Sequence, residues 1–277
     1  FLSTYIYSTI EIDGKLDEPE WDSAKEINQF YEIFPYSLKD ADFPTKVLIK
    51  ETDQGIFFGF SSSQKKDTIR ANQHQRDAHF MRTNADLVGV AIDFDGNALT
   101  AFDFYVSAGG SIGDAIIKNE QQFDGDWDGE WYAKTSESEE NWYSEFFIPW
   151  TMVSMNQQEG PNRKIGIATS RLIQHEAKYV AFPKASPLRK KFLSLLHTIE
   201  VVQSNPTRLD FYPYLVAKDD FLNDDVSYQA GSEIFFANGK GGELSVTLNP
   251  DFGQVESDNI VINYSARETF YSDKRPF

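Results

Sequence analysis

The sequence predicts an all-β protein, an antiparallel β-sandwich followed by strands that belong to a truncated β-barrel. The first observation is a series of short apolar segments, rich in β-branched and aromatic residues, which Gly, Asn, Asp and Ser clusters interrupt about every 8 to 15 residues. The second is a weak helical periodicity, which allows only a turn or two at residues 18–24 and 149–155. The third is a change beyond Asn205, where longer segments alternate apolar and polar side chains.

The predicted strands follow one another through the first part of the chain. Residues 45–50 and 56–61 predict a hairpin, because Gly55 tolerates the positive φ that the turn between them requires. The other candidates share a β-branched and aromatic run between turn signals: 87–93, 100–107, 130–133, 142–148, 164–172 and 178–182. Together they predict a sandwich domain over residues 1–205.

Residues 206–277 form a second predicted domain. Leu244, Val246 and Leu248 alternate with polar residues, and residues 260–265 repeat this period of two. Such alternation suits a half-solvated sheet, and equally a membrane barrel whose strands place apolar side chains outward. A closed barrel needs at least about eight strands, so any barrel is incomplete in this chain.

The composition excludes several classes of function. The 277 residues contain 26 Lys and Arg against 43 Asp and Glu, a formal net charge of −17. Nucleic-acid binding requires a surplus of basic side chains, so no nucleic-acid partner is expected. The absence of Cys removes disulfides, thiol nucleophiles and Cys-ligated zinc. The chain opens at Phe1 without Met or a basic-then-apolar leader, which is the expectation for a mature exported protein whose signal was removed.

Three motifs in the first domain resemble carbohydrate-binding module family 9. Residues 12–21 read I-D-G-K-L-D-E-P-E-W, residues 86–93 read D-L-V-G-V-A-I-D, and residues 142–149 read W-Y-S-E-F-F-I-P. They resemble the family's opening segment and two of its strands, in the family's order. The resemblance implies a non-catalytic β-sandwich that binds glycan.

The tail resembles a different family. Residues 249–258 read N-P-D-F-G-Q-V-E-S-D, and R-E-T-F and K-R-P-F follow at 267–270 and 274–277. These motifs resemble an uncharacterised family in which a module similar to family 9 precedes a predicted outer-membrane β-barrel of Gram-negative bacteria. The resemblance implies a location in the cell envelope, with the chain's own C-terminal barrel or another envelope protein as partner.

The ligand set of family 9 is largely missing here. The family's site is a pair of tryptophans assisted by a Glu and an Arg. Residues 79–84 contain no Trp, and Gly89 stands at the Glu position. Tyr105 stands at the Arg position and Phe182 at the late Trp position. The resemblance therefore implies the scaffold without the family's contacts.

Candidate contacts come instead from residues 123–131, which read F-D-G-D-W-D-G-E-W. An acidic loop punctuated by Gly exposes its side chains, so Trp127 and Trp131 are the predicted carbohydrate-binding residues. An indole face packs against the apolar side of a pyranose ring.

The same loop is a candidate metal site. Asp124, Asp126, Asp128 and Glu130 alternate along it, and Ca²⁺ prefers several converging carboxylates. The start imitates half of an EF-hand, but Thr135 stands where the bidentate Glu is required. A calcium loop and a solvated acidic turn both remain open.

No catalytic motif accompanies these candidates. The sequence has no H-E-x-x-H zinc motif and no G-x-S-x-G elbow, so no enzyme is predicted and any link to glycoside hydrolysis is that of an accessory module. Two hypotheses follow. The chain is the soluble module of an outer-membrane protein that binds glycan, or it is a structural or gating domain that contacts an envelope barrel and binds no sugar.

Overall fold

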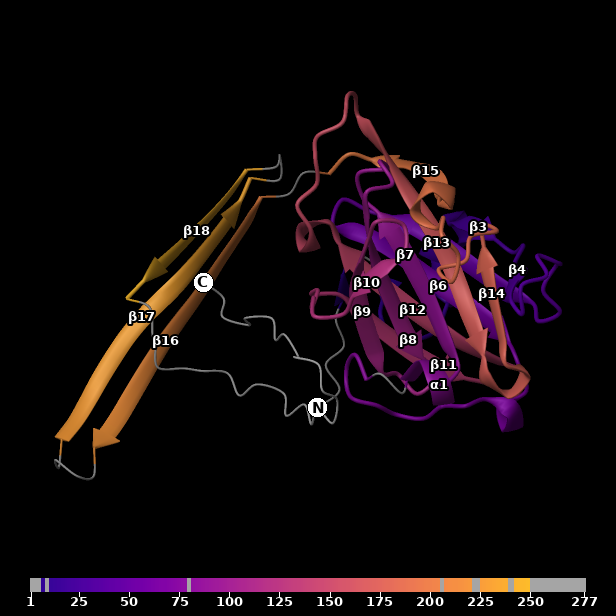
Figure 1. The fold of residues 1–277 in the computed structure, drawn as a ribbon, viewed down its shortest axis with the longest axis horizontal. Coiled ribbons are helices and arrows are strands. Elements are labelled where there is room, and N and C mark those ends of the chain that lie inside the picture. The colour runs from indigo at the N-terminus through magenta and orange to yellow at the C-terminus, as the bar shows by residue number, and fades with distance from the viewer. Residues whose placement is uncertain are drawn as a thin grey trace, which may run out of the picture. The chain divides into compact units, whose positions relative to one another are not determined.

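The computed structural model describes residues 6–7, 10–78, 81–204, 207–220, 225–238 and 242–249. These residues divide into two compact units: the first contains the residues up to Thr207 together with Asn238 and Gly242, and the second contains those of Arg208–Ala237 and from Glu243 onward. Both units consist almost entirely of antiparallel strands (Figure 1). The predicted all-β class and the antiparallel sandwich are therefore confirmed.

The larger sheet of the first unit has eight strands. Seven follow the spatial order β10-β9-β8-β7-β13-β14-β4, and β15 pairs with a second stretch of β13. Their bounds are β4 Tyr31–Phe34, β7 Leu87–Asp93, β8 Thr100–Ser107, β9 Ile112–Lys118, β10 Gln122–Asp124, β13 Asn162–Ile173, β14 Lys178–Phe182 and β15 His197–Val202.

The smaller sheet has five strands in the order β11-β12-β6-β5-β3. Their bounds are β3 Lys25–Ile27, β5 Thr45–Glu51, β6 Gly55–Ser63, β11 Tyr132–Glu137 and β12 Asn141–Pro149. A further short pair, β1 (Ile6–Tyr7) and β2 (Ile10–Glu11), lies before them in the chain.

The core lies between the two sheets because alternate residues of each strand point inward. Phe60 and Phe146 come from the five-stranded sheet, while Val90 and Phe104 come from the eight-stranded one, and all four are fully buried. The residues between them on the eight-stranded sheet face outward, which leaves its second face for other contacts.

Short helical segments complete the unit. The turns predicted at 18–24 and 149–155 are present as 3₁₀ segments, Pro19–Ser23 and Trp150–Met152. Further 3₁₀ turns lie at Lys66–Thr68, Gln174–Glu176 and Leu193–Leu195, and one α-helical turn, α1, spans Met81–Asn84.

Strand predictions were right where β-branched and aromatic residues run uninterrupted. The predicted bounds 87–93, 100–107 and 178–182 are those of β7, β8 and β14. The strand expected at 130–133 lies instead at Tyr132–Glu137, because Gly129 and Glu130 still belong to the preceding loop.

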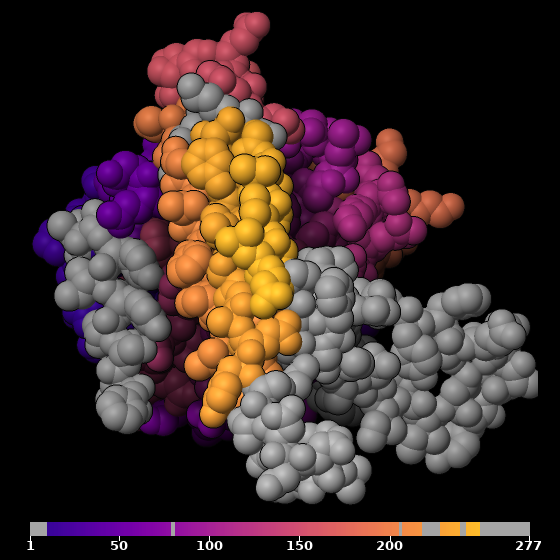
Figure 2. All heavy atoms as spheres, turned by 90° about the vertical axis from the view of Figure 1, so that its left-hand side faces the viewer, coloured from indigo at the N-terminus to yellow at the C-terminus, as the bar shows by residue number. Residues whose placement is uncertain are grey.

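The second unit is a three-stranded antiparallel sheet of β16 (Arg208–Asp220), β17 (Asp225–Ala237) and β18 (Glu243–Leu248). Figure 2 shows these strands, orange to yellow, as a long and narrow sheet. β18 confirms the strand expected around Leu244, whereas residues 250–277, with most of the tail motifs, lie outside the described residues. Among the described residues, no helix has the length and apolarity that crossing a membrane requires.

Candidate cavity on the outer face of the sandwich

A cavity of about 630 Å³ lies on the outer face of the eight-stranded sheet. Tyr105 of β8, Leu172 of β13 and Tyr179 of β14 line it, whereas their chain neighbours Phe104 and Val180 lie in the core. Because successive residues of a strand point to opposite faces, the cavity lies on the side of the sheet away from the sandwich core.

One part of this outer face is covered by the segment after β14. Ala185, Phe192 and Leu193 of that segment pack against alanines such as Ala91 and Ala168 on the sheet. Small side chains there let the segment lie close to the sheet. Beyond this contact the face stays open, and Pro187 and Leu188 of the segment form one wall of the cavity.

Arg82 is the fixed cation of the cavity. It projects from α1, which is held to the sheet by the fully buried Met81 packed in one cluster with Tyr105. Its guanidinium donates to Oδ2 of Asp103 at 2.6 Å and lies 4.1 Å from the centre of the Tyr105 ring. The Arg82 side chain is still 41% exposed, so it has surface left for a ligand.

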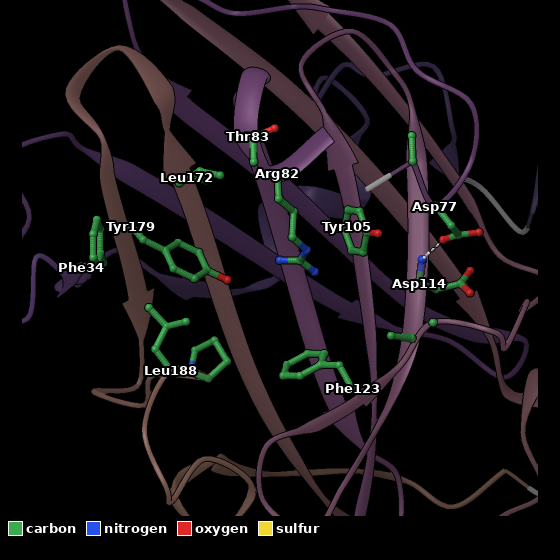
Figure 3. Close-up of a pocket in the computed structure, with 14 residues that line it drawn as sticks. Phe34, Asp77, Arg82, Thr83, Tyr105, Asp114, Phe123, Leu172, Tyr179 and Leu188 are labelled. Atoms are coloured by element: carbon green, nitrogen blue, oxygen red, sulfur yellow. Dashed lines mark hydrogen bonds between the residues drawn. The ribbon is translucent and has the colours of Figure 1, made fainter. Parts of the chain in front are cut away.

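Two phenols flank this cation (Figure 3). Burial raises the pKa of Tyr105 and of Tyr179, so both hydroxyls are neutral near pH 7 and can donate or accept hydrogen bonds. The Tyr179 hydroxyl donates to Oγ of Ser170 at 3.2 Å. Burial also raises the pKa of Asp103, an effect that Arg82 opposes.

Exposed apolar side chains surround these polar groups. Phe34 of β4 is 49% exposed, Phe123 of β10 is 43% exposed and Leu188 is 63% exposed. In Figure 3 the Phe34 ring lies to the left of Arg82 and the Phe123 ring lies below it. The cavity thus combines apolar faces at its rim with a charged donor and two hydroxyls between them.

A group of acids lies at one edge of the cavity. Oxygens of Asp77, Asp114 and Asp128 lie within 4.8 Å of one another. Arg76 compensates them, with Nε 2.8 Å from Asp128 and 3.5 Å from Asp77 and with a hydrogen bond to Asp114. Burial raises the pKa of Asp77 and of Asp114. These acids therefore already have a cation among them.

The predicted sugar platforms lie elsewhere. Trp131 is 3% exposed, stacks on Phe146 with centroids 5.6 Å apart, and donates its indole N–H to Asp114 at 2.6 Å. Trp127 is half-buried, with its ring 4.8 Å from that of Phe102. Neither is among the residues that line the cavity. Trp131 has almost no surface left for a ligand, whereas a ligand contact at Trp127 stays a prediction.

The four acids proposed for calcium do not converge. Asp124 lies 3.5 Å from Lys118, Asp128 pairs with Arg76, and Glu130 accepts a hydrogen bond from the Tyr132 hydroxyl. Asp126 is exposed, and its backbone N–H donates to Asp124. Only Asp128 belongs to the acid group described above, and calcium binding by the loop stays a prediction.

Two of the positions marked by the sequence resemblance lie at this cavity. Tyr105 and α1, which lies within residues 79–84, both contribute to its lining. Gly89 lies beside Tyr105, and Phe182 packs at the edge of the core. Phe34, Phe123 and Leu188 were missed, since each lies on a short strand or a loop without a recognisable pattern.

Comparisons with known proteins give three similarities. A family described as a domain of unknown function (DUF5916) matches residues 205–277. The structure is similar to a family 9 carbohydrate-binding module from Caldicellulosiruptor kristjanssonii in complex with cellotriose, with a TM-score of 0.48, 12% identity and coverage of 72% of this chain and 97% of that chain. It is also similar to a candidate carbohydrate-binding protein from Bacteroides uniformis, with a TM-score of 0.46, 11% identity and coverage of 62% and 86%. No curated protein matches the sequence.

Proposed function

We propose that the first unit is a non-catalytic module that binds a glycan in the cavity on its outer face. The observation that carries this proposal is that the exposed rings of Phe34 and Phe123 line the same cavity as the guanidinium of Arg82. Sugar sites combine rings for the apolar face of a pyranose with polar groups for its hydroxyls. The volume of about 630 Å³ lies within the range of roughly 300–1,000 Å³ typical of small-molecule sites.

The lining also supports recognition rather than catalysis. Asp77 and Asp114 are the two carboxylates among the lining residues, and both are ion-paired with Arg76. Glycoside hydrolysis requires one carboxylic acid and one carboxylate placed on either side of the scissile bond. Figure 3 shows both carboxylates directed away from Arg82 and the middle of the cavity.

Glycan-array screening followed by calorimetric titration of the chain tests this proposal. Arg82→Gln and Phe123→Ala should each weaken the binding of any glycan found. Leu99→Ala, a substitution of an apolar residue that is 68% exposed outside the cavity, is the matched control and should have no effect. No binding to any glycan at millimolar concentration would refute the proposal and leave the structural or gating role as the better reading.

A separate observation supports a membrane role for the second unit. Pairing places Leu215 beside Ala230, Phe211 beside Ile234, and Phe236 beside Leu244. Directly paired residues share a face of the sheet, so one face is mostly apolar. Its apolar residues are Leu209, Phe211, Pro213, Leu215, Ala217, Tyr228, Ala230, Ile234, Phe236, Leu244, Val246 and Leu248, and Ser232, which pairs with Pro213 and Leu248, is a polar residue among them.

The opposite face carries polar groups. Arg208 and Asp210 form an ion pair on it, and Gln229, Glu233 and Thr247 share it with the apolar Val216 and Phe235. Strands with one lipid-facing and one polar face are those of membrane barrels. We therefore propose that the second unit supplies strands of an outer-membrane barrel in the envelope of a Gram-negative bacterium, and that the protein is exported.

Site-specific labelling tests this second proposal, since the chain has no Cys to interfere. Leu215→Cys and Val216→Cys, neighbours on opposite faces, are each labelled with an environment-sensitive fluorophore in lipid vesicles. A quencher in the lipid tails should quench the label at position 215 and spare the label at 216. Equal quenching at both positions would contradict a lipid-facing sheet.

A further inference from the structure

The wall of the cavity that follows β14 carries an unusual concentration of positive charge. Residues 184–191 contain four of the chain's 26 basic residues, in a chain whose formal net charge is −17. All four are exposed: Lys184, Arg189, Lys190 and Lys191. We call residues 184–191 the basic segment.

The charges of the basic segment have no acidic partners among the described residues. None of its four cations forms an ion pair there, although other basic side chains of this acidic chain do. Lys184 and Arg189 lie instead over aromatic rings, 4.2 Å from the Tyr31 centroid and 3.9 Å from the Tyr36 centroid. Cation–π contacts hold a side chain in place without neutralising it.

The segment is fixed at both ends, so its charges have a defined place. Ala185 and Ser186 are buried before the exposed part, and Phe192 is buried after it. Glu120 accepts backbone N–H bonds from Phe192 at 2.8 Å and Ser194 at 3.1 Å. These contacts hold both ends of the intervening turn against the sheet.

The turn adjoins the cavity described above. Pro187 and Leu188 of the basic segment line it. Phe34, which lies in sequence between Tyr31 and Tyr36, lines it as well. Figure 3 shows Leu188 and Phe34 on the same side of the cavity, with Arg82 further inside. The unpaired cations of the basic segment therefore flank lining residues in sequence, and the guanidinium of Arg82 lies in the cavity itself.

We propose that the cavity selects an acidic glycan, one whose sugar rings carry carboxylate or sulfate groups. This proposal rests on glycan binding in the cavity as its proposed function. Arg82 and Arg189 suit carboxylate and sulfate because a guanidinium offers a planar set of donors that matches them. The unpaired cations of the basic segment raise the local concentration of an anionic chain near the cavity.

Calorimetric titration of the full chain with matched ligands tests the proposal. Trigalacturonate is compared with its methyl ester, which keeps the sugar rings and removes the charge, and with a sulfated tetrasaccharide. Titrations are run at about 20 mM and about 0.5 M salt, because exposed charges are screened over roughly 3–4 Å at the higher concentration and over more than about 20 Å at the lower one. The acid should bind about tenfold more tightly than its ester at low salt, and this difference should disappear at high salt.

Charge removal provides the second arm. The basic-segment variant combines Arg189→Gln, Lys190→Gln and Lys191→Gln, and the control combines Lys46→Gln, Lys65→Gln and Lys134→Gln. The control positions are exposed on or directly after strands of the five-stranded sheet, and their removal changes the net charge equally. The first variant should bind the acid about tenfold more weakly and the ester with unchanged affinity. The control should bind both ligands as the wild type does.

Three results separate the possible failures. Equal affinities of the wild type for acid and ester at low salt would overturn the acidic-glycan proposal and leave glycan binding intact. Binding of only the sulfated or only the carboxylated ligand identifies which anion is recognised and supports the proposal. Binding of none of these three ligands would overturn the acidic-glycan proposal, and glycan binding itself fails only if the glycan array shows no binding either.

Discussion

Glu145 of β12 gives a stability prediction that the structure makes quantitative. The residue is fully buried, and its Oε2 accepts the backbone N–H groups of Asp13 at 3.0 Å and Gly14 at 2.8 Å. Its other oxygen has no hydrogen-bond partner. Burial raises the pKa of Glu145 from 4.5 to about 8, against the effect of these hydrogen bonds. The carboxyl that anchors the opening motif is therefore protonated at neutral pH.

The sign of the pH effect follows from proton binding. The folded chain keeps this proton up to about pH 8, whereas the unfolded chain loses it near pH 4.5, so stability falls as the pH rises between those values. Each pKa unit corresponds to about 1.4 kcal/mol. The rise from about pH 5 to about pH 7.5 should therefore lower the free energy of unfolding by about 3 kcal/mol through this group.

Chemical denaturation of the wild type and of Glu145→Gln across this pH range isolates the effect. Gln keeps an oxygen for the two N–H groups but buries an unpaired amide, at a pH-independent cost of about 1–3 kcal/mol. The variant should be less stable than the wild type near pH 5 and should equal or exceed it near pH 8. The pKa values of Asp93 and Asp114, which are buried, and of Asp77 and Asp103, which are half-buried, are also raised, so the difference between the two proteins is the quantity to follow.

Glu140→Gln is the matched control, because Glu140 is exposed in the turn before β12. Its stability should follow that of the wild type at every pH. A difference between wild type and Glu145→Gln that does not change with pH would show that Glu145 is ionised in the folded chain, and the reasoning would fail.

Three further predictions concern the same unit. Gly14→Ala should lower the free energy of unfolding, measured by urea denaturation, by at least about 2 kcal/mol. The reason is that Gly14 has a φ of +88° and that a Cβ there would lie 2.6 Å from the backbone carbonyl carbon of Thr135. An unchanged denaturation midpoint would show that the segment relaxes freely. Trp131→Ala should cost about 3–5 kcal/mol by the same assay, as for a large core side chain, and a near-neutral result would mean that this indole is not packed as described. If the acidic loop binds calcium, Ca²⁺ added after chelation should raise the melting temperature of the wild type and leave that of the Asp124→Ala/Asp126→Ala variant unchanged. The same response in both proteins would show that the loop does not bind calcium.

The sequence predicts the sandwich well because the strands follow the alternation of apolar and polar side chains along the sequence. β7, β8 and β14 have uninterrupted β-branched and aromatic runs, and their bounds were predicted correctly. β9 was missed because Gly113 and Asp114 interrupt its pattern. Both are explained only by tertiary contacts: Tyr105 packs where a Cβ of Gly113 would lie, and Asp114 accepts the indole N–H of Trp131.

The cavity could not be predicted in the same way, because its lining comes from parts of the chain that only folding brings together. Phe34 lies on a four-residue strand, Arg82 on a single helical turn, and Phe123 on a three-residue strand. None of these elements is long enough to show a period. The signal present in the sequence was the cluster of basic residues at 184–191, which stands out only against the acidity of the whole chain.

The acidic loop contributes to the cavity through its first residues rather than its tryptophans. Asp114 accepts hydrogen bonds from both Trp131 and Arg76, so the buried indole and the guanidinium hold the C-terminal end of the loop against β9. Arg76 also donates to the Gly129 carbonyl at 2.7 Å. With the loop fixed there, β10 pairs with β9 and brings Phe123 to the rim of the cavity. The contacts with Asp114 and Arg76 therefore decide which side chains of this loop are exposed. Trp131 is buried by them, whereas Phe123 stays accessible at the rim of the cavity.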